Sequence, residues 1–383
     1  MPYRDGARRR LRTRAVLGPP PAVPPPAAGP VRSVQGIVVD ASPHVLVLDT
    51  GDDEPARLPM TAATSIWHGG RSGLPALVPG RHAVVRCTPD GRVAERIWVD
   101  IMRVTGTIVA CTERSVEVDG GPHRGPAHVT IPPNALGRIL VRHPRMEPGY
   151  LVDVICVRTP DGPHAVRPGT SQPSHPADRV TSPPPEPPGS PSVVEGTATW
   201  FGDLVPPWEP PSPAWPPSTV MPAPLTPSPA SRRIPPGPSR PAVAAGSPFS
   251  EAHPSEGRRW RLCGDLRGAA YPAVDPVGHA GGCADAPEGC ARLPYLSCGS
   301  ELIVHNRCSD RTVRVPVTEC GCVAVRYCDR CVECGTSPRG RVVELTPLSF
   351  VELGGDLDAG CFNVTLGLAA TAASPGPVTE GRP

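Results

Sequence analysis

The 383-residue sequence contains no lysine, so its 38 basic residues are all arginine. A high-GC genome, which encodes arginine in place of lysine, accounts for this in the simplest way. The absence excludes chemistry through a lysine Schiff base and any phosphate-binding loop that needs a lysine. The net charge of +2 provides no broad electrostatic attraction to nucleic acid, so we expect no nucleic-acid partner.

Aromatic residues and long apolar runs are also scarce. Aromatics make up 4% of the chain, whereas 58 residues are proline and 40 are glycine. Because proline and glycine interrupt helices, this composition predicts small, loop-rich, mainly β folded parts. No segment reaches the ~20 apolar residues of a membrane span. The arginine-rich start lacks the apolar stretch of a secretory signal, which leaves the export route open between a mis-assigned start, non-standard secretion and delivery in a phage particle.

Cysteine is distributed very unevenly. Eleven of the 14 cysteines lie between Cys263 and Cys361, and the other three are Cys87, Cys111 and Cys156. Such density in a short segment is typical of a disulfide scaffold in an oxidising compartment. We therefore expect an extracytoplasmic protein, secreted or in the cell envelope, or one associated with a virion.

Proline-rich stretches divide the chain. The segments predicted to lack a packed core are 1–30, 169–192, 204–257 and 369–383. The segments predicted to fold are 31–102, 103–168, 193–203 and 258–368. A lone strand is not stable unpaired, so 193–203 should be the first strand of a barrel completed by 258–368, with 204–257 as an insertion.

The first two folded segments form an internal repeat. VQGIVVDASPHVLVLDTG (34–51) corresponds to VTGTIVACTERSVEVDGG (104–121), and each has two alternating strands around a polar turn. Both continue into a strand, ARLPMTAATSIW or AHVTIPPNALGRI, and then into a Pro-Gly turn. This pattern resembles two small OB-like β-barrels. Such barrels often bind oligomers, but basic and aromatic residues are not grouped here, so we favour a scaffold or protein-docking role over ligand binding.

The C-terminal segment has its own order of predicted elements. Two alternating strands flank a polar turn at Ser309 and Asp310, and a cysteine-rich loop follows. A strand at 342–345 precedes a short helix that is capped at Thr346 and has a proline at its first position. The last strand is predicted at 361–366.

Three blocks of this segment resemble the rare lipoprotein A-like domain, which expansins and barwin-like proteins share in outline. They are GTATWFG (196–202), LSCGSELIV (296–304) and RVVELTP (341–347), the last followed in register by Phe350, Leu353, Gly354 and Gly360. The resemblance covers under a third of the chain. It implies a disulfide-rich double-psi β-barrel, and with the repeats it completes a mainly β fold.

The resemblance also implies chemistry on cell-wall glycan. Lytic members of the family use an aspartate and a histidine to cleave peptidoglycan, whereas expansins use a carboxylate and a threonine to loosen wall polymers. The matching positions here are the candidate catalytic residues Glu319, Glu344 and Thr199, while the histidine position falls near Arg292. Trp200 and Arg292 are the candidate glycan contacts. Glycoside cleavage needs a proton donor and a carboxylate or base, so the missing histidine and the longer acids favour binding without cleavage.

The cysteine-rich loop has two interpretations. Its C-x-C and C-x-x-C spacings can bind zinc through Cys322, Cys328, Cys331 and Cys334. Disulfides are favoured because further cysteines lie nearby, and the pairing is left open among Cys263, Cys283, Cys290, Cys298, Cys308, Cys320 and Cys361.

The expected function is therefore that of a peptidoglycan-binding or wall-remodelling protein whose catalysis has degenerated. One alternative is a structural virion or envelope component, such as a phage tail or capsid-surface protein. Another is an active lytic transglycosylase-type enzyme. Cell-wall glycan is the expected partner, with protein partners at the N-terminal barrels, and no cofactor is expected.

Overall fold

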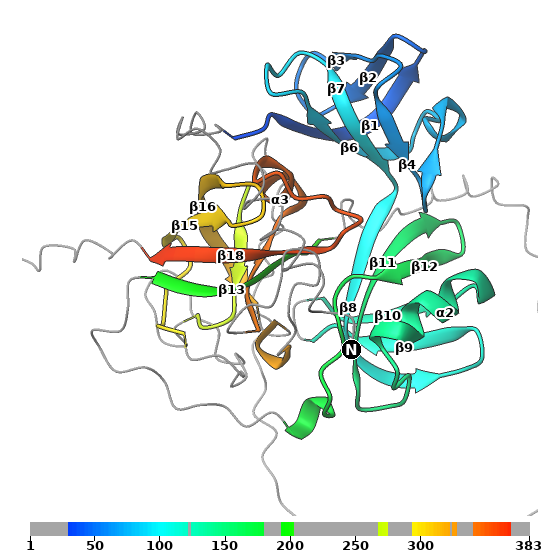
Figure 1. Ribbon diagram of the computed structural model, residues 1–383. Coiled ribbons are helices and arrows are strands. Elements are labelled where there is room, and N and C mark those ends of the chain that lie inside the picture. Colours follow the sequence, from blue (N-terminus) through cyan, green and yellow to red (C-terminus); the bar gives the residue numbers. More distant parts are fainter. Residues whose placement is uncertain are drawn as a thin grey trace, which may run out of the picture. The chain divides into compact units, whose positions relative to one another are not determined.

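The computed structural model describes residues 30–121, 124–179, 193–202, 267–274, 293–321, 324–327 and 340–368. These residues form a mainly β fold with small closed barrels, as predicted (Figure 1). Within them, no helix combines the length and apolar character needed to cross a membrane. The insertion 204–257 and the predicted tail 369–383 lie outside the described residues.

The first repeat is a seven-stranded sheet with a short 3-10 helix, η1 (Leu74–Ala76). Its strands are β1 (Ser33–Ala41), β2 (Val45–Asp49), β3 (Ala56–Pro59), β4 (Ser65–Trp67), β5 (Arg71–Ser72), β6 (His82–Cys87) and β7 (Ala94–Val99). Their order in the sheet is β3-β2-β1-β6-β7-β4-β5. Alternate side chains such as those of Leu46 and Leu48 are fully buried, which is the period of two expected for a strand with one face on a core.

The second repeat is a closed barrel with the strand order β10-β12-β11-β8-β9. Its elements are β8 (Ile101–Cys111), β9 (Ser115–Asp119), β10 (Pro126–Thr130), α2 (Pro133–Arg142), β11 (Leu151–Thr159) and β12 (Gly162–Pro168). The expected single strand AHVTIPPNALGRI is in fact β10 followed by α2, because a proline at the first helical position is preset for a helix. Ala135 and Ile139, one turn apart, are the buried residues of this helix.

The two repeats share the same backbone requirements. A side chain at Gly36 or at Gly106 would collide with the carbonyl oxygen of the aspartate on the neighbouring strand, at 2.3 and 2.1 Å respectively. The Pro-Gly turns carry Gly80 and Gly149 at φ of 86° and 87°, a region that favours glycine. The repeats differ in the third strand, which is interrupted between β3 and β4 in the first and continuous in β10.

The C-terminal barrel is closed by six strands in the order β13-β17-β14-β16-β15-β18. Its elements are β13 (Val193–Trp200), β14 (Ala269–Tyr271), β15 (Glu301–Asn306), β16 (Arg311–Cys320), the 3-10 helix η3 (Ala324–Arg326), β17 (Arg341–Leu345), α3 (Pro347–Glu352) and β18 (Cys361–Leu368). As predicted, the strand upstream of the insertion belongs to this barrel, since β13 pairs in parallel with β17 and antiparallel with β18.

The three folded parts belong to one compact unit. In the first repeat, the Val31 amide donates a hydrogen bond to the carbonyl oxygen of Glu352 in α3, at 3.1 Å. Residues 169–179, which we expected to be linker, pack against the second barrel and end in the 3-10 helix η2 (Ala177–Arg179). The Ala177 amide, for example, donates to the Gly149 carbonyl at 2.8 Å.

Candidate functional site

The barrel topology brings the three candidate catalytic residues together. Thr199 of β13 and Glu344 of β17 are register partners on adjacent strands, and the Thr199 hydroxyl lies 3.5 Å from a Glu344 carboxylate oxygen. Glu319 of β16 and Glu344 both stand in register with Ala270 of β14, one on each side of that strand. Register partners on neighbouring strands face the same side of a sheet, so the two acids share one face. We call these two carboxylates with Thr199 the carboxylate groove.

An arginine from the second barrel occupies this groove. Arg124 lies in the turn between β9 and β10, and its Nη2 is 2.7 Å from Glu344 and 3.3 Å from Glu319. Its guanidinium also stacks on the Phe201 ring, 4.8 Å from the centroid. The Glu344 side chain is 0% exposed, whereas that of Glu319 is 34% exposed, so only Glu319 is accessible from solvent.

A buried chain of ion pairs continues from Glu344 into the second barrel. Arg341 donates to Glu344 at 2.9 Å through one guanidinium nitrogen and to Asp153 through another. Arg103 holds Asp153 with two hydrogen bonds of 2.8 and 2.6 Å. The side chains of these residues are at most 1% exposed. Each buried charge thus has an opposite charge beside it, as burial requires.

The pKa values follow from this arrangement. Burial acts to raise the pKa of Glu344, but Arg124 and Arg341 outweigh it and hold that pKa below its ordinary value. The same balance, with Arg103 and Arg341, lowers the pKa of Asp153. Burial disfavours the charged form of Arg124, yet Glu344 and Glu319 raise its pKa. Glu344 is therefore an ionised hydrogen-bond acceptor at neutral pH and is not placed to donate a proton to a glycosidic oxygen.

The two candidate glycan contacts have different outcomes. Trp200 is fully buried, and its Nε1 donates a hydrogen bond to the Leu357 carbonyl at 2.8 Å. Its ring lies in the barrel core and not on a surface where a sugar could stack, so the assignment of Trp200 to glycan binding is wrong. Arg292 lies outside the described residues. Phe201, the next residue along from Trp200, is half-buried and does border the groove.

The cysteine predictions are tested only in part by the described residues. Cys308 and Cys320 are each disulfide-bonded. Cys298 carries a thiol whose pKa is raised, first by burial and then by the nearby Glu319 charge. The buried Cys361 lies at the start of β18. The other cysteines of both interpretations lie outside the described residues, namely Cys263, Cys283, Cys290, Cys322, Cys328, Cys331 and Cys334.

No group of three or more potential metal ligands occurs in the described ranges. The zinc interpretation concerns the cysteine-rich loop beyond those ranges. It stays an alternative to the disulfides there.

Several residues of this site were not singled out from the sequence. Arg103, Asp153 and Arg124 belong to the second repeat, where nothing in the alternating pattern distinguishes them from solvated charges. Tyr327 lies within the cysteine-rich stretch, between Cys322 and Cys328, and its hydroxyl lies 3.2 Å from the Gly106 amide. Arg341 could have been noted, because it stands three residues before Glu344 in the most specific block of the resemblance.

No known protein-family model matches the sequence, and no curated protein matches it.

Proposed function

We propose that this is an extracytoplasmic protein that binds cell-wall glycan through a C-terminal barrel of the rare lipoprotein A-like, double-psi type, without cleaving the glycan. The observation that carries the proposal is the convergence of Glu319, Glu344 and Thr199, which the motif resemblance alone selected, on one face of a closed six-stranded barrel. Thr199 precedes the two acids by more than 100 residues of sequence, and its proximity to them in the barrel supports one shared site.

The same geometry supports binding over cleavage. A glycosidase needs a protonated acid next to the scissile oxygen. Glu344 is ionised and enclosed by Arg124 and Arg341, and Glu319 is held by Arg124 as well. What remains accessible is the Glu319 carboxylate, an acceptor for sugar hydroxyls, beside the ring of Phe201. An aromatic ring next to a hydrogen-bonding carboxylate is suited to an apolar sugar face with polar edges.

Cosedimentation with purified peptidoglycan tests the proposal. Glu319→Gln and Phe201→Ala should each weaken binding by about tenfold, the effect of removing one charged hydrogen bond or one stacked ring. Glu195→Gln is the matched control, because Glu195 is a 46% exposed carboxylate of the same barrel that pairs with Arg307 at 3.0 Å. Binding by both groove variants at the level of the control would contradict a glycan site here.

Muropeptide analysis after long incubation tests the second half of the proposal. We expect the peptidoglycan profile to stay unchanged, since Glu344 is ionised and enclosed and Arg124 pairs with Glu319. New cleavage products that disappear in Glu319→Gln would show instead that the protein is a lytic enzyme.

A structural role in a virion or envelope complex is the second candidate. It is favoured by the buried ion pairs of Asp153 with Arg103 and Arg341, which tie the second barrel to the C-terminal barrel with charges that no substrate reaches. Detecting the protein in purified particles or assembled envelope complexes, at a fixed ratio to known components, would support this role. Finding it only as free protein would remove it.

A further inference from the structure

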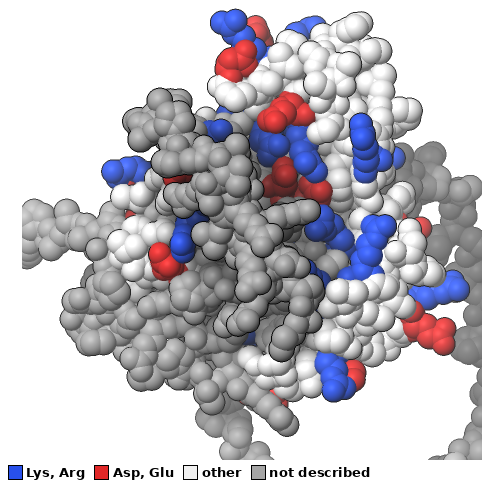
Figure 2. Space-filling view, in the orientation of Figure 1, with Lys and Arg blue, Asp and Glu red and all other residues white. Residues whose placement is uncertain are grey.

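A concave site lies away from the carboxylate groove. Residues of the first repeat, the second repeat and the C-terminal barrel line a cavity of about 450 Å³. This volume is within the ~300–1,000 Å³ typical of small-ligand sites. In the space-filling view, basic side chains gather near the middle of the face shown, beside acidic ones (Figure 2).

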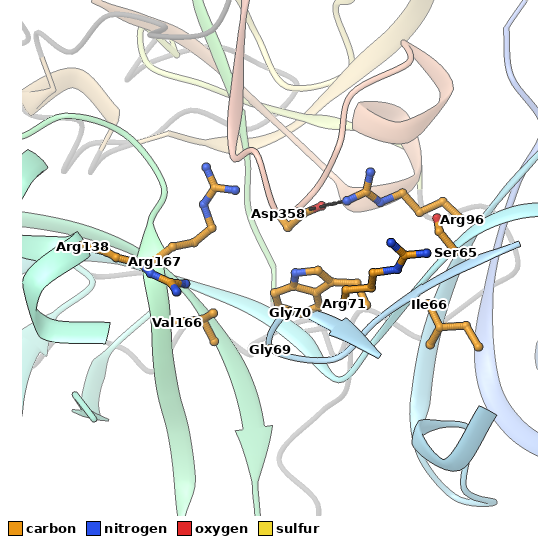
Figure 3. A pocket seen from close by; sticks show the side chains of 11 residues that line it. Ser65, Ile66, Gly69, Gly70, Arg71, Arg96, Arg138, Val166, Arg167 and Asp358 are labelled. Atoms are coloured by element: carbon orange, nitrogen blue, oxygen red, sulfur yellow. Dashed lines mark hydrogen bonds and ion pairs between the residues drawn. The ribbon is translucent and has the colours of Figure 1, made fainter. Parts of the chain in front are cut away.

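Four arginines line this cavity: Arg71, Arg96, Arg138 and Arg167. They come from separate elements, β5, β7, α2 and β12. Figure 3 shows Arg138 and Arg167 on one side of the cavity, Arg71 and Arg96 on the other, and Asp358 between them. The sequence contains arginine throughout, so isolated solvated arginines are unremarkable. Four arginines from four elements around one cavity do need an explanation. Like charges brought close together repel one another unless an anion lies between them.

Among the residues that the structure describes, one carboxylate lines the cavity, and it is already engaged. Asp358 receives hydrogen bonds from Arg96 at 2.8 and 3.0 Å and from the Trp98 indole at 2.7 Å. Arg96 is also 3.4 Å from Asp356. Across the ranges that the structure describes, neither Arg71 nor Arg138 has a carboxylate within ion-pair distance, so no described acidic side chain compensates their charges.

The rest of the lining accommodates a ligand with a small uncharged part. Gly69 and Gly70 form the turn between β4 and β5 at φ of 73° and 152°, and a side chain added at Gly70 would meet no atom within 4 Å. The turn therefore leaves the cavity open at this point. Ile66, Trp67 and Val166 supply apolar surface.

We propose that this cavity is a binding site for a phosphate group, carried on a small ester or on a phosphodiester polymer. A carboxylate is planar, and a single guanidinium can satisfy both of its oxygens. A phosphate presents oxygens in several directions, and so it can accept from Arg71 on one side and Arg138 on the other at once. The site is separate from the carboxylate groove and does not depend on glycan binding there.

Isothermal titration at constant ionic strength tests this assignment, because salt would otherwise screen the comparison. The full-length protein is titrated with inorganic phosphate, glycerol 3-phosphate, poly(glycerol phosphate) and succinate. We expect saturable binding of the phosphates and at least about tenfold weaker binding of succinate. If glycerol 3-phosphate binds more tightly per phosphate than poly(glycerol phosphate), the natural ligand is a small ester. If the polymer binds more tightly per phosphate, the natural ligand is a phosphodiester polymer.

Two double variants distinguish binding at this cavity from a general effect of positive charge on the surface. Arg71→Gln with Arg138→Gln should weaken phosphate binding on the order of a hundredfold, about tenfold for each guanidinium removed. Arg57→Gln with Arg142→Gln removes the same charge from exposed positions that do not line the cavity, one on β3 and one on α2. It should bind as the unchanged protein does.

Three results would overturn the proposal. These are the absence of saturable binding for every phosphate probe, succinate binding as tight as phosphate binding, and equally weakened binding in the two double variants. Circular dichroism of both variants confirms that the fold is intact, which is expected because Arg71 and Arg138 are exposed.

Discussion

Replacing Asp153 by asparagine should destabilise the protein by about 3–5 kcal/mol, the range for breaking a buried ion pair from one side. The Asp153 carboxylate is 0% exposed and accepts hydrogen bonds from Arg103, Arg341 and the Thr170 hydroxyl. Asparagine keeps the shape but removes the charge that two buried guanidiniums share. Arg341 would retain Glu344, whereas Arg103 would retain no carboxylate partner that the structure describes.

Urea unfolding followed by tryptophan fluorescence measures this destabilisation, because Trp98 and Trp200 are fully buried. With an unfolding slope of roughly 3 kcal/mol per molar urea, the midpoint should fall by about 1–1.7 M. Asp161→Asn, at an exposed carboxylate in the turn between β11 and β12, is the control and should leave the midpoint unchanged. Adding Arg103→Gln to Asp153→Asn should recover part of the stability, since it removes the stranded charge.

A destabilisation below about 1 kcal/mol in Asp153→Asn would refute the reasoning, because it would mean that the buried charges are not mutually dependent. Full additivity of the two effects in the double variant with Arg103→Gln would refute it as well, since groups that touch each other should be coupled.

Three further measurements follow from the same interactions. Burial lowers the pKa of His143, and that of His82, to about 4 from the ordinary 6.5. The unfolded chain therefore binds protons first as the pH falls, and stability should be lost below pH 6.5, about 2 kcal/mol by pH 5 for each histidine. In thermal unfolding, His143→Gln should remove the His143 half of this loss. Arg124→Gln should cost about 1–3 kcal/mol in urea unfolding, because the buried Glu344 loses one of its two guanidinium partners; an unchanged midpoint would contradict the bridging role. Intact-mass measurement without reductant should show at least the disulfides of Cys308 and Cys320, and a mass unchanged by reduction would contradict them.

Much of the fold could be predicted because it depends on local pattern. Alternating side chains identified the strands of both repeats, and the isolated segment 193–203 could be assigned to the C-terminal barrel because a strand needs a partner. The capping threonine and first-position proline of α3 located that helix. Helix α2 is not predicted by the pattern, because its two prolines are equally consistent with an interrupted strand, although Pro133 starts the helix.

The sequence predicts only those residues around the carboxylate groove that match a position of the family motifs. Thr199 and Glu344 stand in two of the matched blocks, and Glu319 is assigned from the position of the family's aspartate. Arg124 is not predicted, since it binds Glu344 across 220 residues of sequence and no local pattern marks such a pairing. The sequence also could not predict that Trp200 is buried, because the motif fixes the residue type and not the face of the barrel on which its ring lies.

The position of β13 has a consequence for how the chain becomes folded. The Trp200 indole of β13 is bonded to Leu357, 157 residues further along, and β13 lies between β17 and β18 in the barrel. Closing so long a loop costs entropy before any pairing is gained, which slows folding. During synthesis, the second repeat can fold early, whereas β13 must wait for β18, almost the last described part of the chain to leave the ribosome. A chain shortened before β18 would therefore lack a closed C-terminal barrel, and the edge of β13 that pairs with β18 would be open to pairing with other chains.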